Sequence, residues 1–123
     1  MKGLHLTADL YRCHCEPRWL ADGQALQAWC ATALEAVGLR PVAHAFHQGA
    51  TARGAGGVSG SILASGAHLC LHTLPAEQSV SLDVYVRNDG ADLSAKARGL
   101  MFALVQRFQP EWTEQRSLDR GEE

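Results

Sequence analysis

Hydrophobic and polar residues alternate in several short stretches of the chain, a pattern typical of strands with one buried face. In residues 4–11 leucines and an alanine alternate with histidine, threonine, aspartate and tyrosine, and residues 67–74 and 79–87 alternate in the same way. A tight turn at Ser65-Gly66 joins two of the expected strands. The pattern predicts strands over residues 4–11, 41–48, 57–65, 67–74 and 79–87.

Two other stretches have apolar residues at helical spacing. The first runs from Leu26 to Val37 and is followed by Gly38, a residue that commonly ends helices. The second covers residues 97–108, with Asp92 or Ser94 available as its cap and Pro110 as its end. We therefore predict two amphipathic helices, each with one face in the core.

The remaining segments lack clear periodicity. Residues 49–57 are rich in glycine, and we expect them to form a mobile loop. The tail, residues 112–123, is expected to supply a last short strand before it frays.

The order of these elements is β-α-β-β-β-β-α-β, and most strands are adjacent in sequence. This order predicts a single α+β domain over residues 1–123, a two-layer sandwich with a mostly antiparallel sheet and both helices on one face. The other face of the sheet is then free to pack on another molecule. In so small a chain, a second copy is the expected partner, which predicts a homodimer.

Composition narrows the classes of function. The chain has 123 residues, of which 46% are hydrophobic, as is typical of a globular domain. Its net charge is −2, so neither nucleic acid nor a membrane surface is an expected partner. No apolar run approaches a membrane span, and the amino terminus does not resemble a signal peptide, which predicts a cytoplasmic protein. Cys13 and Cys15 lack the CxxC spacing of redox or zinc motifs. We expect all four cysteines, Cys30 and Cys70 included, to be reduced thiols.

The run GVSGSILASGAHLCLHTLP, residues 57–75, resembles the core motif of the prokaryotic S-adenosylmethionine decarboxylases, a pyruvoyl-dependent family of polyamine (spermidine) biosynthesis. The resemblance extends over nearly the whole chain. Its other elements are the first strand HLTADLY, the pair Phe46-His47, the strand Leu82-Asp83-Val84-Tyr85 and the terminal Arg120-Gly121.

The resemblance implies a catalytic centre that this chain lacks. In the family, a serine hydroxyl attacks the preceding carbonyl, the resulting ester eliminates, and the new amino terminus becomes a pyruvoyl group that acts as the electron sink. The equivalent residue here is Ala67, whose methyl group cannot make that attack. Arg87 stands where the family has its proton-donating cysteine. We therefore expect a non-catalytic homologue, a pseudoenzyme without the pyruvoyl cofactor.

Other family-equivalent positions are retained or altered around that centre. Ser59 and His72 match residues that assist self-cleavage in the family, and Phe46 matches an aromatic position near the substrate adenine. Gly66 and Leu74 replace the family's glutamate and tryptophan, and Ala76 replaces a second glutamate, with Glu77 one place beyond it. The expected ligand-binding residues are Phe46, His68, His72 and Arg87.

Alternatives remain open at this point. Ser65 is a candidate for a displaced processing serine, which would make the chain an active decarboxylase of S-adenosylmethionine or another amino acid, although we favour a hairpin turn there. His68, Cys70 and His72 share one strand face and carry metal-ligating groups, but we predict no metal because alternate residues lie wide apart. Arg87 is a candidate for binding an anion in the old pocket. A heteromer with an active paralogue is an alternative to the homodimer.

Overall fold

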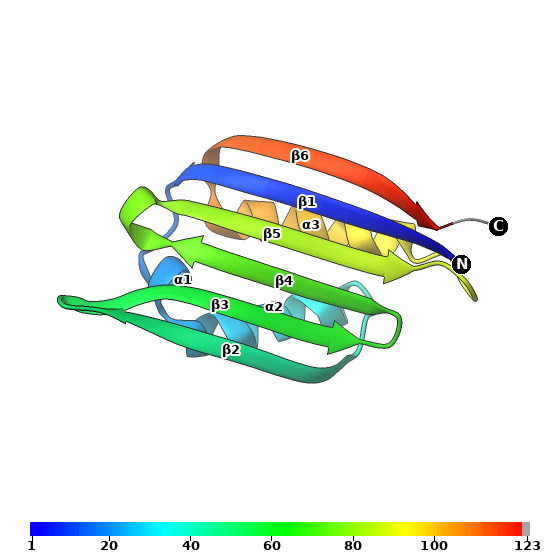
Figure 1. Ribbon diagram of the computed structural model, residues 1–123, viewed down its shortest axis with the longest axis horizontal. Coiled ribbons are helices and arrows are strands. Elements are labelled where there is room, and N and C mark those ends of the chain that lie inside the picture. Colours follow the sequence, from blue (N-terminus) through cyan, green and yellow to red (C-terminus); the bar gives the residue numbers. More distant parts are fainter. Residues whose placement is uncertain (122–123) are drawn as a thin grey trace.

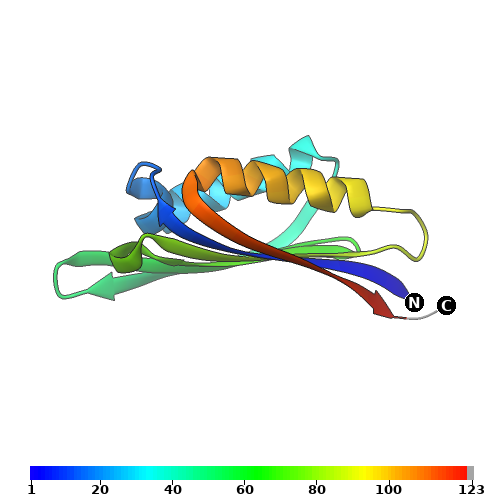
Figure 2. The same ribbon diagram turned by 90° about the horizontal axis from the view of Figure 1, so that it is seen from above.

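The computed structural model describes residues 1–121 and has two layers (Figure 1). One layer is a six-stranded antiparallel sheet in the order β2-β3-β4-β5-β1-β6. Figure 2 shows the helices together on one side of it, so the predicted α+β sandwich is confirmed. The elements are β1 (Lys2–Cys13), α1 (Arg18–Ala21), α2 (Gly23–Ala36), β2 (Pro41–Thr51), β3 (Gly54–Ala64), β4 (Ala67–Leu74), the 3-10 turn η1 (Pro75–Glu77), β5 (Ser79–Arg87), α3 (Ser94–Phe108) and β6 (Pro110–Gly121).

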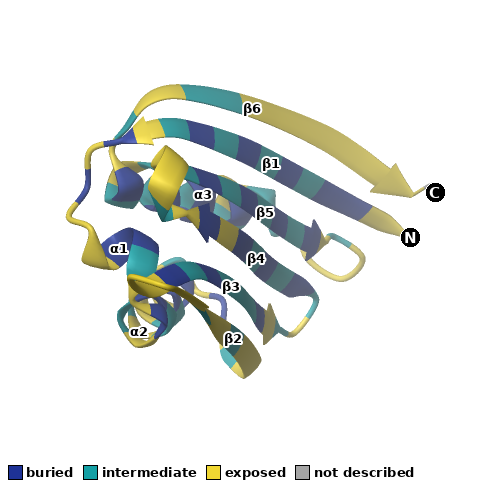
Figure 3. Ribbon diagram, turned by 60° about the vertical axis from the view of Figure 1, so that its left-hand side comes forward, coloured by how far each residue is buried: buried dark blue, intermediate teal, exposed yellow. Residues whose placement is uncertain are grey.

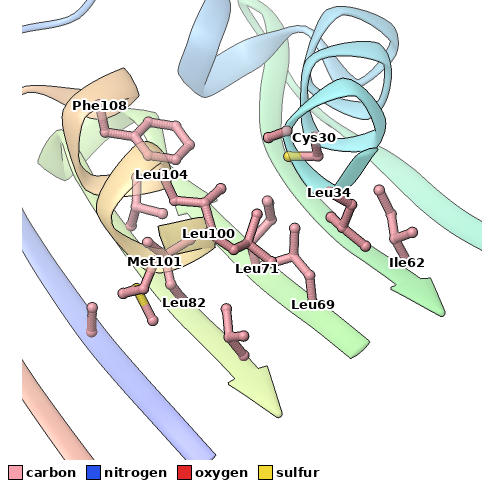
Figure 4. Packing of buried hydrophobic residues seen from close by; sticks show 14 of the residues in the cluster. Cys30, Leu34, Ile62, Leu69, Leu71, Leu82, Leu100, Met101, Leu104 and Phe108 are labelled. Carbon is pink, nitrogen blue, oxygen red and sulfur yellow. The ribbon is translucent and has the colours of Figure 1, made fainter. Parts of the chain in front are cut away.

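The hydrophobic core lies between the sheet and the helices (Figure 4). The apolar stripe of α3 contributes Leu100, Leu104 and Phe108, each no more than 1% exposed. These side chains meet alternate residues of the central strands, such as Leu71 and Leu82, which are equally buried. The period-2 and period-3.6 patterns of the sequence therefore marked the two surfaces that pack on each other.

The predicted turn at Ser65-Gly66 is confirmed. β3 ends at Ala64 and β4 begins at Ala67, so only these two residues connect the strands. Gly66 has a φ of +68°, a left-handed conformation that glycine adopts without steric penalty.

The mobile loop predicted for residues 49–57 is wrong. β2 and β3 extend into this segment as a hairpin, in which Ala50 pairs with Ala55 and Thr51 pairs with Gly54. The two strands approach closely: a Cβ at Gly49 would lie only 2.7 Å from the carbonyl oxygen of Gly57. Backbone pairing forms this hairpin without large apolar side chains, so hydrophobic periodicity carried no signal for it.

Two further boundaries differ from the prediction. The last strand is not short, since β6 begins at Pro110 and pairs with β1 along nearly its whole length; the expected fraying at residues 122–123 lies outside the described residues.

The short helix α1 was not predicted. α3 begins at Ser94, whose N–H donates to Asp92 Oδ1 (2.9 Å), and the preceding N–H, of Leu93, donates to Asn88 Oδ1 (2.7 Å).

Candidate functional site

The sheet face without helices carries four of the chain's six histidines, together with Cys70 and Asp83. Directly paired residues of antiparallel strands point to the same face, so the register orders these side chains in rows. Three rows follow from the pairing: His47, Ser59, His72, Ser81, Asp9 and Glu114; Ala45, Ser61, Cys70, Asp83, Thr7 and Arg116; and Leu63, His68, Tyr85, His5 and Leu118. We call this surface the open face.

The first row contains a hydroxyl–imidazole pair. Ser59 on β3 lies directly opposite His72 on β4, and Ser59 Oγ is 2.8 Å from His72 Nδ1. His72 is exposed and Ser59 half-buried, so the pair is open to a ligand or partner. Such a pair can exchange a proton with a reacting group placed against it.

The third row forms a denser cluster around Tyr85. The Tyr85 ring is 5.4 Å from the ring of His68, 6.4 Å from that of His5, and 5.5 Å from the guanidinium of Arg120. His5 Nε2 also hydrogen-bonds Asp83 Oδ1 at 3.0 Å. Burial and the neighbouring His5 lower the pKa of His68, partly opposed by Asp83. The surroundings of His68 therefore favour its neutral imidazole.

Residue 67 faces the opposite side of the sheet. Ala67 is 8% exposed and pairs with Ala64 and Val86, so its methyl group lies in the helix-covered core. The preceding carbonyl, of Gly66, accepts a hydrogen bond from the Arg87 N–H at 2.7 Å. The two positions that the resemblance predicts to be equivalent to the family's serine and cysteine are therefore neighbours, and the described structure carries no side-chain nucleophile at either of them.

The Arg87 side chain forms a local ion pair. Its Nε and Nη2 both donate to Asp89 Oδ2, at 3.0 and 2.6 Å. Asp89 also accepts the backbone N–H of Lys2 at 2.8 Å. This N–H, and then Arg87, lower the pKa of Asp89. The Arg87 charge is thus balanced by a residue two places further along the chain.

The structure does not bring the four expected ligand-binding residues together. Arg87 lies beside the start of β4, next to Ala67. His72 is five residues further along β4, a separation of roughly 16 Å at strand spacing. Phe46 pairs with Gly60 and faces the helices, where it packs against the core, whereas His68 and His72 are on the open face. Within one chain, Phe46 and the two histidines therefore lie on opposite faces of the sheet.

Metal and thiol chemistry have little support from the geometry. In the described part of the chain, residues 1–121, no group of three or more His, Cys, Asp or Glu side chains is placed to hold a metal ion. Cys70 Sγ is instead 3.4 Å from Ser61 Oγ. Burial raises the pKa of Cys13 to about 11 and that of Cys30 to about 12, so both thiols are protonated at neutral pH.

Sequence reasoning missed the cluster around Tyr85. The alternation of residues 79–87 already placed Asp83 and Tyr85 on one face. It gave no sign that β1 and β6 would flank β5 and bring His5 and Arg120 beside Tyr85, because these neighbours come from opposite ends of the chain. A covariation between the first and last strands is the signal that would have found them.

This architecture is that of the S-adenosylmethionine decarboxylase sandwich. The crystal structure of the adenosylmethionine decarboxylase from Aquifex aeolicus VF5 superimposes with a TM-score of 0.80 at 23% identity, covering 97% of this chain and 90% of that one. The model of the family described as S-adenosylmethionine decarboxylase matches residues 4–121, so the chain belongs to this family. A search of curated proteins finds no match. No helix within residues 1–121 is long and apolar enough to cross a membrane.

Proposed function

We propose that this protein is a non-catalytic member of the S-adenosylmethionine decarboxylase family, with a ligand-binding or regulatory role in spermidine metabolism. The observation that carries the proposal is Ala67. The pyruvoyl group does not fit this chain, because forming it requires a hydroxyl at residue 67 and the side chain there is a methyl group in the core.

The neighbouring serine is a poor substitute. Ser65 is exposed in the two-residue turn between β3 and β4, whereas Ala67 is held within a ladder between β3 and β5. Self-cleavage depends on a strained peptide held against its proton acceptors, and an exposed turn does not provide such constraint. Processing at Ser65, followed by decarboxylation of S-adenosylmethionine or another amino acid, is the alternative.

The open face is the surface we assign to binding. It retains the Ser59–His72 pair and also carries large apolar side chains in contact with solvent: Leu63 is 48% exposed, Leu118 58% and Trp112 59%. Apolar side chains around a polar centre are a feature of interaction surfaces. We propose that a second copy of this chain covers the open face, with an active paralogue as the alternative partner.

Intact-mass analysis of the purified protein tests the absence of processing. We expect one full-length chain, unchanged by Ser65→Ala. Ala67→Ser is the matched variant, because it returns only the missing hydroxyl. Two fragments from the wild-type chain, divided near residue 66 and with a carbonyl-blocked second fragment, would contradict the proposal. Their disappearance in Ser65→Ala would establish the displaced site instead.

Light scattering tests the partner. Leu63→Lys places a charge on the large exposed apolar side chain that β3 contributes to the open face, and we expect it to reduce the assembly mass. Phe102→Lys on α3 is the matched control, since Phe102 is similarly exposed (65%) but lies on the helical layer. An unchanged mass in Leu63→Lys would exclude the open face as the interface.

A further inference from the structure

The two edges of the sheet differ in their protection against other strands. An edge strand presents unpaired N–H and C=O groups, and natural proteins protect such edges with charged side chains. β6, at one edge, carries Glu111, Glu114, Arg116, Asp119 and Arg120. β2, at the other edge, contains no Asp, Glu, Lys or Arg over its 11 residues.

The charges on β6 are organised along that edge. Arg116 contacts both Asp9 (3.4 Å) and Glu114 (2.9 Å), and Glu111 contacts Arg12 at 3.3 Å. A strand added beside β6 would have to desolvate these groups. β6 is therefore protected against edge pairing.

The central part of β2 has a regular and accessible backbone. The register with β3 is uninterrupted from Ala43 to Gln48, between irregularities at the two ends of the strand. Within residues 42–47, the described backbone hydrogen bonds belong to the ladder with β3. Figure 3 shows most of β2 coloured as exposed, and Val42 is 67% exposed.

The side chains of β2 are compatible with a symmetric copy. The Phe46 ring leans over Gly60 toward β3 and away from the edge. A two-fold axis through Ala45 places Ala45 opposite itself, His44 opposite Phe46 and Ala43 opposite His47. Each of these pairs shares a face of the sheet, and no histidine lies opposite another histidine.

We propose that β2 is a second self-association surface, through which two copies pair antiparallel to form one continuous sheet. The partner is another copy of this chain, because the two-fold arrangement pairs each side chain with one on the same face and brings together neither charged residues nor two histidines. This interface is independent of the open face, since it uses backbone groups at the sheet edge.

The first test introduces lysines at the edge and replaces no residue of the three open-face rows. Val42→Lys with His44→Lys protects the edge as β6 is protected, and His44 is on the helix-covered side. The matched control is Gln115→Lys with Ser117→Lys, two exposed positions of β6 that pair with the helix-facing Ala8 and Leu6. Light scattering should show a twofold loss of assembly mass for the β2 variant and none for the control. An unchanged mass in a β2 variant with a native circular dichroism spectrum would overturn the proposal.

A second measurement uses the wild-type chain. Hydrogen–deuterium exchange at low and high protein concentration should show concentration-dependent protection of amides in residues 42–47 and none in residues 111–117. Equal exchange of residues 42–47 at both concentrations would also overturn the proposal. Open-face pairing buries side chains rather than edge amides, so the two interfaces are tested separately. If Leu63→Lys reduces the assembly mass and the β2 variant does not, the open-face interface is supported and edge pairing is excluded.

Discussion

The two faces of β4 show how differently packing and chemistry constrain the same eight residues. Leu69 and Leu71 are each 1% exposed and pack beneath the helices, whereas His68 and His72 lie on the open face. The helix-facing residues are determined by the volume available in the core. The open-face residues contribute little to that packing, so their side chains are free to take part in interactions or chemistry.

The two ends of β4 differ as well. At one end, Ser59 and His72 still form a hydrogen-bonded pair. At the other, Ala67 carries only a methyl group, and its neighbour Arg87 is bound to Asp89. Both ends lie in the same antiparallel sheet, so they differ in individual side chains rather than in the fold.

The largest expected effect comes from the helix-facing side. Leu71→Ala removes a fully buried side chain and leaves a cavity, so we expect it to destabilise the fold by about 2–5 kcal/mol. His72→Ala, one residue away on the exposed side, should change stability by less than about 0.5 kcal/mol. Chemical denaturation of the two variants measures the difference. Similar losses in both would mean that the open face also carries the fold.

A buried hydroxyl on the helix-facing side should have the next largest effect. Thr73 Oγ1 donates to the Leu20 carbonyl (2.6 Å) and accepts from the Val58 N–H (2.9 Å), which joins β4 to α1 and β3. Thr73→Val leaves both buried partners unsatisfied, and we expect a loss of about 1–3 kcal/mol in denaturant unfolding. Thr7→Val on the open face is the control, expected within about 0.5 kcal/mol of the wild type.

The open face should make stability depend on pH through His68. Its pKa is lower in the folded chain than the ordinary value of 6.5, so between the two values the unfolded chain binds more protons and stability rises with pH. The contribution is complete above about pH 6.5 and is lost as pH falls through the lower folded-state pKa. Unfolding free energies measured across this range should have a smaller slope in His68→Gln. An identical slope would contradict the assignment.

The smallest effect is expected for the Ser59–His72 pair. Because His72 is exposed, a double-mutant cycle of Ser59→Ala and His72→Ala should give a coupling energy of less than about 1 kcal/mol in unfolding. The same variants should nevertheless alter any association or ligand binding at the open face. A large coupling energy in stability would mean that the pair was retained for the fold.

The amino-acid sequence by itself determined the elements whose side chains face the core. Alternation in residues 67–74 and 79–87 gave the exact bounds of β4 and β5, and the apolar stripe of residues 97–108 marked α3. Hydrophobic burial is periodic along a strand or helix, so it leaves a trace in the sequence. The sequence also determined that residue 67 has no hydroxyl, because the residue at that position is alanine.

Only the tertiary structure decided which residues meet. Two features depend on strand neighbours that are distant in the chain: the charged edge of β6 and the cluster of His5, His68, Tyr85 and Arg120. A third feature, the hairpin of residues 49–57, depends on pairing between backbone groups alone. The same holds for Phe46, which lies on the opposite face from the histidines grouped with it. Pairing between strands leaves no periodic signal in one sequence, because backbone hydrogen bonds are the same for every residue type except proline.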